Sequence, residues 1–421
     1  MKPAAILLLL MTPLFAAERE IVFPASAKPI GPYSPGILFD DVLYISGQGS
    51  FDPAGVLPKT AADQTRQCLS NIQAIVEAAH MSMANIVYTH TYLSRMEDYA
   101  AVNKVYPEVF TGTLPARSTM GVARMPQETP IEITAVAVRG TAMKPITLPN
   151  ATSPVPLSPG IVAGGRLFLS GILGRDAEAN VTPAQGSAQI DLCLSRIARV
   201  LTAANLTAPH LLHLNVYRTS QLPAAEVEAR FRTAFPEAAL SVIEVAALPF
   251  GVQVGVTGVA ALQLAAKRVH KVNGHVTCAA VGKTVYCAAQ AADTAGEALR
   301  SLDDSLHAMG SSLANALATN VYLNNIETFP NMNAIYALQF AKPFPTRTTV
   351  QPQATGLTPG VRIAVVAAIR SSLPLTQTAN DTLSPGAVYE SHRFADWFHR
   401  FRVLTLCTSP RHYIDHVESR R

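Results

Sequence analysis

The chain has 421 residues, of which 49% are hydrophobic and 15% charged, and its formal net charge is +4 at pH 7. This composition excludes extensive disorder, and the length suits about three domains of ordinary size. The weak charge, without a Lys/Arg cluster before the extreme C-terminus, argues against a nucleic-acid-binding surface.

Residues 1–17 have the composition of a secretory signal peptide: one lysine, an apolar run over 4–15, and then Ala16 and Ala17. That run is too short to span a membrane, and no later apolar run is long enough. We predict cleavage near Ala17 and a secreted or periplasmic protein. A cytoplasmic protein with an uncleaved apolar N-terminus and a lipid-surface anchor are the alternatives.

Five cysteines are spread widely along the chain: Cys68, Cys193, Cys278, Cys287 and Cys407. They form no CxxC pair and no His-rich ligand pattern, so we expect no metal site. An odd number without a disulfide framework predicts buried free thiols that act as small hydrophobic residues.

Three similar blocks follow one another. Strand-like segments at 43–48 (LYISGQ), 167–172 (LFLSGI) and 285–290 (VYCAAQ) each precede a stretch with helical periodicity, at 64–79, 188–204 and 292–309. In the first of these helices Leu69, Ile72 and Ile75 share one face. Cys68 and Cys193 occupy the same point of the first two helices, which indicates a packing position.

The remaining elements also recur. Further strands are expected at 86–93, 211–218 and 316–323, second helices at 98–110 and 329–340, and closing strands such as 117–123 and 131–138. The order predicts an α+β fold of three tandem units, each a mixed sheet with two helices on one face.

Composition places the domain boundaries in Pro/Thr/Ser-rich stretches. We expect repeat 1 at 18–142, repeat 2 at 143–265 and repeat 3 at 266–371. The tail 372–421 holds the only tryptophan, Trp397, and matches no repeat. It is either a flexible appendage or an interaction segment.

The first block contains IGPYSPG, YISGQ, AVNKVY, LPARSTM and IEITAVAV in that order. Together these motifs resemble the RidA/YjgF family of enamine and imine deaminases, also labelled L-PSP endoribonucleases. The resemblance implies chorismate-mutase-like subunits that form a trimer around a central barrel of sheets, with ligand clefts between neighbours. It also implies hydrolysis of 2-aminoacrylate-like enamines and imines to 2-keto acids and ammonia, without metal or cofactor. Three fused units then predict a monomer that closes as an internal pseudo-trimer.

Arg117 matches the family's substrate-binding arginine, whose planar guanidinium offers two parallel donors to a carboxylate. Arg347 repeats this position in the third block, whereas Leu240 occupies it in the second. The alternative for Arg117 is a salt-bridged arginine at a strand end.

Glu132 matches the acidic residue that holds the attacking water and passes protons. The same register places Gly255 in repeat 2 and Arg362 in repeat 3. Since only repeat 1 has both partners, we expect the best site there, and we expect Arg117→Ala to abolish hydrolysis. The alternative for Glu132 is an outward-facing strand residue.

Other residues are carried over from the same motifs. Tyr33 matches an aromatic wall of the cleft and is replaced by Leu157 and His275 in the other repeats. Ser46 and Gly47 supply a small hydroxyl and a close backbone approach beside the pocket, or pack an ordinary strand end.

Asn103 in repeat 1 corresponds to Asn333 in repeat 3 and to Glu228 in repeat 2. The amides bond the ligand or orient neighbouring backbone. Thr119 and Thr349 stand where the family often has cysteine, so hydrolysis survives only if that position acts through its backbone.

Two classes of function remain open. The first is a metal-independent deaminase acting on a small imino acid, without nucleic acid as a partner. The second is a non-catalytic module that binds small carboxylates, because two repeats lack the arginine or the glutamate. An endoribonuclease is the third and least favoured option, since a basic, aromatic-lined stripe and a His pair are missing.

Overall fold

The computed structural model describes residues 19–140, 143–149, 155–265, 267–340, 342–353 and 360–369. The expected signal peptide, the tail 372–421 and Cys407 lie outside these residues. Within them, one order of elements occurs three times.

Repeat 1 consists of β1 (Glu20–Val22), β2 (Gly36–Phe39), β3 (Val42–Gly49), α1 (Ala61–Ala78), β4 (Ile86–Leu93), α2 (Tyr99–Val109), β5 (Ala116–Gly121) and β6 (Ile131–Val138). Repeat 2 consists of β7 (Lys144–Pro145), β8 (Gly160–Ala163), β9 (Arg166–Leu173), α3 (Gly186–Ala203), β10 (Leu211–Arg218), α4 (Ala224–Ala234), β11 (Ala239–Glu244) and β12 (Val254–Ala261). Repeat 3 consists of β13 (Arg268–Val272), β14 (His275–Val281), β15 (Thr284–Ala292), α5 (Ala295–Ala308), β16 (Ala316–Leu323), α6 (Phe329–Gln339), β17 (Thr346–Val350) and β18 (Val361–Ala368).

Each repeat folds into a six-stranded mixed sheet with the same strand order. In repeat 1 this order is β1-β2-β3-β6-β4-β5, and only the β4–β5 pair is parallel. The predicted α+β class and the three tandem units are confirmed. The short edge strands β1, β7 and β13 were not predicted, because two to five residues carry too little periodicity to be recognised.

The helices cover one face of each sheet. Thr60 caps α1 by accepting a hydrogen bond from the Asp63 backbone N–H, and the apolar stripe of Leu69, Ile72 and Ile75 is buried against the sheet. The free thiols of Cys68 and Cys193 are fully buried at matching points of α1 and α3. The predicted helix faces are therefore confirmed.

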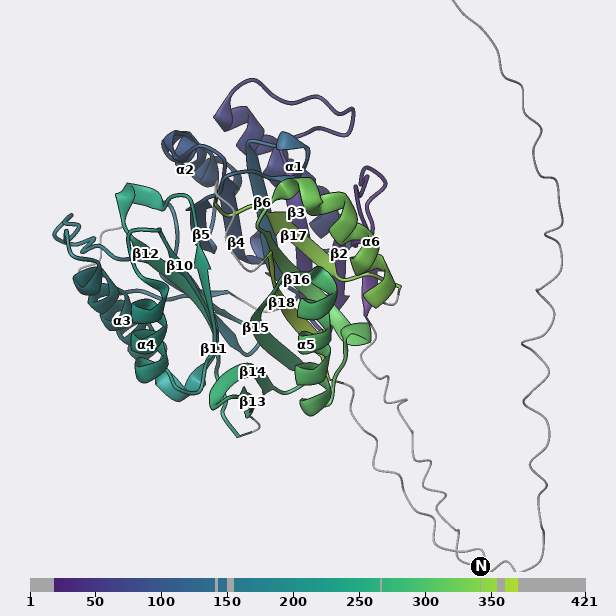
Figure 1. Cartoon of the computed structure of the whole chain (residues 1–421). Coiled ribbons are helices and arrows are strands. Elements are labelled where there is room, and N and C mark those ends of the chain that lie inside the picture. Colours follow the sequence, from purple (N-terminus) through teal and green to yellow (C-terminus); the bar gives the residue numbers. More distant parts are fainter. Residues whose placement is uncertain are drawn as a thin grey trace, which may run out of the picture. The chain divides into compact units, whose positions relative to one another are not determined.

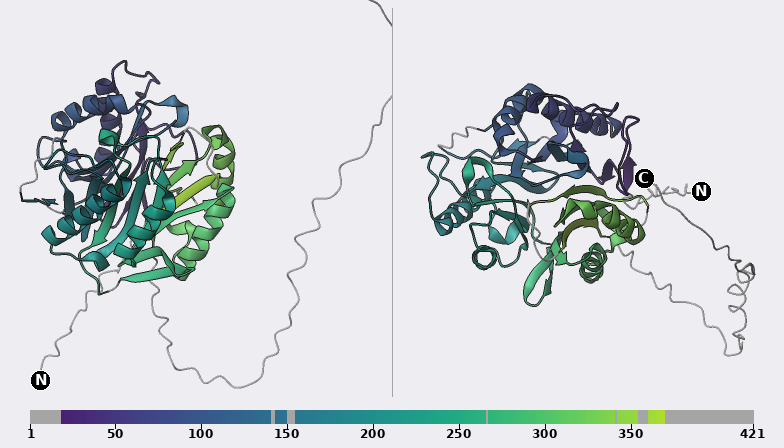
Figure 2. Two further views of the ribbon diagram at one scale, coloured as in Figure 1. Left: turned by 60° about the vertical axis from the view of Figure 1, so that its left-hand side comes forward. Right: turned by 45° about the horizontal axis from the view of Figure 1, so that its top comes forward.

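The helix-free faces of the three sheets pack against one another, and the helix pairs lie outside them (Figures 1 and 2). Tyr92, Tyr217 and Tyr322, one from each repeat, meet in a shared cluster. In the described residues the three sheets stay separate, and the strand pairings between them are single bridges, such as that between Gly121 and Ala247. The closed barrel implied by the resemblance is therefore wrong, and face-to-face packing takes its place.

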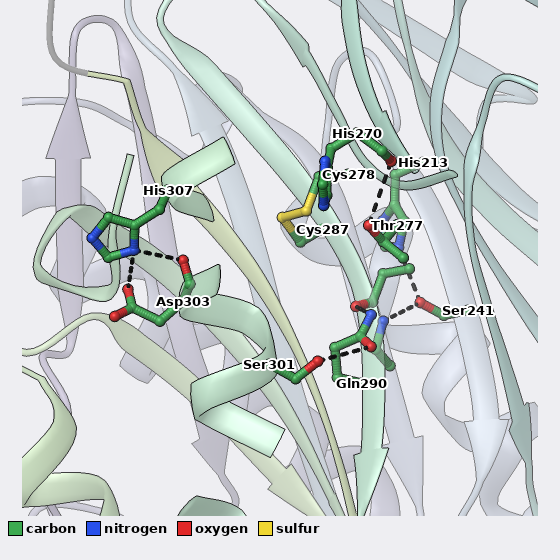
Figure 3. Close-up of a disulfide and its surroundings, with 12 residues drawn as sticks. His213, Ser241, His270, Thr277, Cys278, Cys287, Gln290, Ser301, Asp303 and His307 are labelled. Carbon is green, nitrogen blue, oxygen red and sulfur yellow. Dashed lines mark hydrogen bonds and ion pairs between the residues drawn. A yellow bond between two sulfur atoms is a disulfide. The ribbon is translucent and has the colours of Figure 1, made fainter. Parts of the chain in front are cut away.

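Repeat 3 contains a disulfide that the sequence analysis did not expect. Cys278 and Cys287 lie opposite each other on the antiparallel strands β14 and β15 and are bonded (Figure 3). Both are buried against α5. The expectation of free thiols was wrong for this pair, because cysteine spacing does not reveal that a hairpin register brings two side chains together.

Candidate functional site

Strand register confirms which residues are equivalent in the three repeats. Arg117, Leu240 and Arg347 each occupy the same register position of the edge strand that pairs in parallel with β4, β10 or β16. The residues at the glutamate position each lie opposite the tyrosine of the shared cluster in the neighbouring antiparallel strand: Glu132 opposite Tyr92, Gly255 opposite Tyr217, and Arg362 opposite Tyr322.

Arg117 and Glu132, which the sequence analysis joined in one site, line different cavities. Glu132 lines cavity A, of about 400 Å³, which lies between repeats 1 and 3 and receives its arginine, Arg347, from repeat 3. Arg117 and Thr119 line cavity B, of about 340 Å³, which lies between repeats 1 and 2. The expectation of a complete site within repeat 1 is therefore wrong.

The arginine and the glutamate of repeat 1 line different cavities because of where the arginine-bearing strands lie. β5 and β17 are sheet edges, and each packs against the strand with the Ser-Gly motif in the next repeat, β5 against β9 and β17 against β3. An arginine on such an edge reaches the glutamate position of a neighbouring repeat. Closeness along the chain therefore predicts the wrong partner for Glu132 and for Arg117.

A bulge in β3 shapes the floor of cavity A. The pairing of β3 with β6 shifts register between Ile45 and Gln48, so that Ser46 and Gly47 leave the regular ladder, and such a bulge re-aims the local chain. The Glu132 carboxylate lies so close to Gly47 that a Cβ there would overlap it. The predicted close backbone approach is present, and its partner is the Glu132 carboxylate.

Arg347 is held by side chains of its own repeat and by repeat 1. It is only 4% exposed, and its Nη2 donates a 2.7 Å hydrogen bond to Asn333 Oδ1. Its guanidinium carbon lies 4.8 Å from the ring centroid of Tyr336 and 5.2 Å from that of Tyr33. Burial lowers its pKa, against the raising effects of both tyrosines and of Glu132. Asn333 thus orients the guanidinium, a role that neither expected interpretation of the amide included.

Glu132 is a buried carboxyl group facing a buried arginine. It is 7% exposed, and burial raises its pKa from 4.5 to about 8, while the charge of Arg347 lowers it. Desolvation therefore outweighs the attraction of the guanidinium. A group with this pKa holds or releases a proton near neutral pH, as a general acid or base must.

The other expected residues of cavity A come from both repeats. Tyr33, Ser46 and Thr349 line it. Burial raises the pKa of the Tyr33 hydroxyl, which accepts a 3.3 Å hydrogen bond from the Ile30 N–H. Among the described residues, the buried Thr349 hydroxyl has no hydrogen-bond partner, so it is available to a ligand.

The loop that carries Tyr33 is fastened to repeat 3. Ser34 Oγ donates a 2.6 Å hydrogen bond to the Phe344 carbonyl, and the Ser34 N–H donates one of 3.1 Å to the Pro345 carbonyl. Gly31 lies against Arg347 and Asn333 with no room for a Cβ. Gly31 was not predicted as a site residue, although the glycines of IGPYSPG are a signal for close backbone approach.

Cavity A also has walls that sequence reasoning missed. Phe51 and Asn71 of repeat 1 and Phe329 of repeat 3 line it. Phe51 lies just beyond the end of β3, after Ser50, where a pocket residue is expected once the strand is placed. No sequence signal pointed to Phe329, because its role depends on how repeat 3 packs on repeat 1.

Cavity B repeats part of this arrangement. Arg117 Nη1 donates a 2.7 Å hydrogen bond to Asn103 Oδ1, and the Arg117 backbone N–H donates one of 2.8 Å to Ser170 Oγ of repeat 2. Leu157 stands in the place of Tyr33 and lines this cavity. The residue equivalent to Glu132 in repeat 2 is Gly255, and no Asp or Glu of the described residues lines cavity B.

The junction of repeats 2 and 3 has lost the arginine. Leu240 is part of the hydrophobic core of repeat 2, and His275, at the Tyr33 position, is exposed. On the strand of Leu240, Ser241 contacts the buried His213 at 3.1 Å and accepts a hydrogen bond from the Ala289 N–H of repeat 3 (Figure 3). This junction therefore has no guanidinium at the position of Arg347, and Arg362 occupies the position that Glu132 holds in cavity A.

Among the residues that the structure describes, no helix has both the length and the apolar composition needed to cross a membrane. In the same residues, no three His, Cys, Asp or Glu side chains are grouped so that they could hold a metal ion.

Comparison with known proteins agrees with the repeat structure. The family model described as Endoribonuclease L-PSP matches residues 24–139, 149–262 and 263–369. The chain is 43% identical over 126 residues to 2-iminobutanoate/2-iminopropanoate deaminase of Escherichia coli K12, covering 29% of this chain and 98% of the relative. It is 41% identical over 122 residues to a RutC family protein of Saccharolobus solfataricus, covering 28% and 97%. Among solved structures, the Escherichia coli YjgF gene product matches with 40% identity, 29% and 99% coverage and a TM-score of 0.28.

Proposed function

Because this chain belongs to the Endoribonuclease L-PSP family, which includes the RidA/YjgF proteins, we propose that it hydrolyses small enamines and imines to 2-keto acids and ammonia in cavity A. The observation that carries the proposal is the meeting of Glu132 and Arg347, from different repeats, in one cavity. Relatives named 2-iminobutanoate/2-iminopropanoate deaminase match a single repeat each. The substrate class follows from their names and from the arginine in the cavity.

Arg347 binds the substrate carboxylate through two parallel donors, and Asn333 fixes the plane of the guanidinium. Two walls of the substrate site are Tyr33 and Thr349, and the Thr349 hydroxyl bonds the ligand. The clamp fixes the imine carbon relative to Glu132, which reduces the entropic cost of the attack by water.

Glu132 then moves protons in two steps. As a water oxygen bonds to the imine carbon, the C=N electron pair shifts to nitrogen and the ionised Glu132 takes a proton from the water. Glu132 next returns that proton to nitrogen, which gives a carbinolamine. It then takes the hydroxyl proton and passes it to the same nitrogen, so that the C–N bond breaks, ammonia leaves, and the carbonyl of the keto acid forms. Its pKa of about 8 suits both steps near neutral pH.

The test is an assay of the full chain with imines generated by an amino-acid oxidase. Arg347→Ala is expected to lower kcat/KM by about 100-fold or more, because the clamp is lost. Glu132→Gln is expected to lower kcat while the affinity for a 2-keto acid is kept. Arg66→Ala, on the exposed face of α1, is the matched control.

Comparison of the Arg347→Ala and Arg117→Ala variants shows which cavity carries the chemistry. The loss in Arg347→Ala is expected to exceed the loss in Arg117→Ala by about 10-fold or more, because a full clamp is worth several kcal/mol. An equal or larger loss in Arg117→Ala would assign the chemistry to cavity B. Normal turnover in Glu132→Gln would favour the alternative of a non-catalytic carboxylate-binding module.

We further propose a monomer closed as an internal pseudo-trimer, located outside the cytoplasm. Three tandem units packed through their helix-free faces support the first part, and the Cys278–Cys287 disulfide supports an oxidising compartment. The mass in solution checks the assembly. Cell fractionation checks the location, against the cytoplasmic alternative.

A further inference from the structure

Cavity B carries more positive charge than cavity A and no acid. Three arginines line it: Arg117 from repeat 1, and Arg175 and Arg196 from repeat 2. No Asp or Glu of the described residues belongs to its lining. Cavity A, in contrast, balances Arg347 with Glu132.

The guanidinium of Arg117 is incompletely bonded. Its side chain is only 1% exposed, yet among the described residues its Nε and Nη2 have no hydrogen-bond partner. Buried N–H groups of this kind cost free energy unless a ligand or water satisfies them. The ring of Tyr106 lies 3.9 Å from the guanidinium carbon and holds the group in place.

Arg175 presents a second guanidinium to the same space. It is 9% exposed, its guanidinium carbon stacks 4.0 Å from the ring centroid of Phe250, and its Nε also lacks a partner among the described residues. Phe250 in turn contacts Tyr99 edge-to-face at 5.8 Å. The charges of Arg117 and Arg175 both act on the Tyr99 hydroxyl, so the two guanidiniums face one region of the cavity.

Arg196 adds the third charge from α3. The acidic side chains that act on it are Asp176 and Glu178. Both are engaged elsewhere: Glu178 pairs with Arg199 at 2.7 Å, and Asp176 accepts backbone hydrogen bonds of 2.9 Å. Neither acid lines the cavity, so neither neutralises it from within.

The rest of the lining is largely apolar. Side chains such as Ile146, Leu148, Leu157 and Val200 form the walls. An anion that fills this cavity therefore has a carbon skeleton, and inorganic anions leave the walls uncovered.

We infer that cavity B is a second, non-hydrolytic site that binds a small dicarboxylate, with one carboxylate on Arg117 and the other on Arg175 and Arg196. Gly255 replaces the glutamate that activates water, so the ligand is bound and not converted. The inference is independent of turnover in cavity A, since it concerns binding alone.

The test is isothermal titration of the full-length Arg347→Ala variant with glutarate, butyrate and inorganic phosphate. This background removes the carboxylate clamp of cavity A. Glutarate is expected to bind with one equivalent and at least about 10-fold more tightly than butyrate or phosphate, because both carboxylates are paired.

Further substitutions in the same background locate the site. Arg175→Gln and Arg196→Gln are each expected to weaken glutarate binding by about 10-fold, whereas Arg66→Gln, on the exposed face of α1 and outside the cavity, leaves it unchanged. Thermal unfolding of each variant checks that it is folded. Absence of glutarate binding, equal affinity for butyrate or phosphate, or equal losses in Arg66→Gln would each overturn the inference.

Discussion

Replacing Glu132 by glutamine should stabilise the protein while it removes turnover. Burial raises the pKa of this carboxyl group from 4.5 to about 8, so the folded protein keeps a proton that the unfolded chain releases between these values. Stability therefore falls as pH rises through this window and levels off above about pH 8.

The magnitude follows from the same two values. A pKa change from 4.5 to about 8 corresponds to about 5 kcal/mol of lost stability once the window has been crossed. At pH 7 the group is still largely protonated in the folded protein, and the loss relative to pH 3 is about 3 kcal/mol. Glutamine has no such proton to release, so its variant avoids this loss.

The assay is urea unfolding of wild type and Glu132→Gln at a series of pH values from 5 to 9. The difference in unfolding free energy between the two proteins cancels contributions from other titrating groups. It should increase with pH in favour of the variant and flatten above pH 8. A difference that is independent of pH, or that favours wild type at pH 9, would refute the assignment of a buried, mostly neutral carboxyl group.

Two other predictions follow from the packing. Gly47→Ala should lower turnover by about 10-fold or more, because the new Cβ displaces the Glu132 carboxylate, whereas Gly112→Ala, in open space, should not; equal rates in both variants would count against this contact. His90→Asn, which installs the residue found at the equivalent position of repeat 2, Asn215, should shift the midpoint of acid unfolding in urea to lower pH. Burial lowers the pKa of His90 to about 3, so this histidine costs the folded protein stability as pH falls below about 6.5. An unchanged midpoint in the variant would contradict this prediction.

The sequence predicted what depends on local periodicity. The apolar stripe of α1 and the repeated strand motifs specify the elements, and alignment of the repeats placed Arg347 opposite the same register position as Arg117. These features arise within about 120 residues of chain, where strand order and helix packing fix one another. The residue equivalences were therefore correct.

The contacts between side chains of different repeats could not be predicted from local periodicity. Glu132 meets Arg347 because the edge strand β17 packs against β3. Neither strand carries a sequence pattern that identifies the other as its packing partner. The Cys278–Cys287 bond likewise depends on hairpin register. The first error came from treating proximity along the chain as proximity in space, and the second came from a strand register that cysteine spacing does not show.

Fusion of the repeats explains why the three junctions differ. In a trimer of identical chains one sequence builds every cleft, so a lost arginine or glutamate is lost three times. Here each repeat gives its arginine position to one junction and its glutamate position to another. Leu240 therefore removes the arginine only from the junction of repeats 2 and 3, and Gly255 removes the acid only from cavity B.

The number of complete repeats is thus a poor guide to the number of sites. Repeat 1 has both Arg117 and Glu132, but the two side chains line different cavities. The arginine–glutamate pair of cavity A instead combines Glu132 of repeat 1 with Arg347 of repeat 3. When junctions are compared, cavity A has guanidinium and carboxyl group, cavity B has guanidinium alone, and the third has Leu240 at the guanidinium position. Fusion thus allows the hydrolytic site that we propose in cavity A and the binding site that we propose in cavity B to coexist, because the residues that distinguish the two cavities are encoded separately.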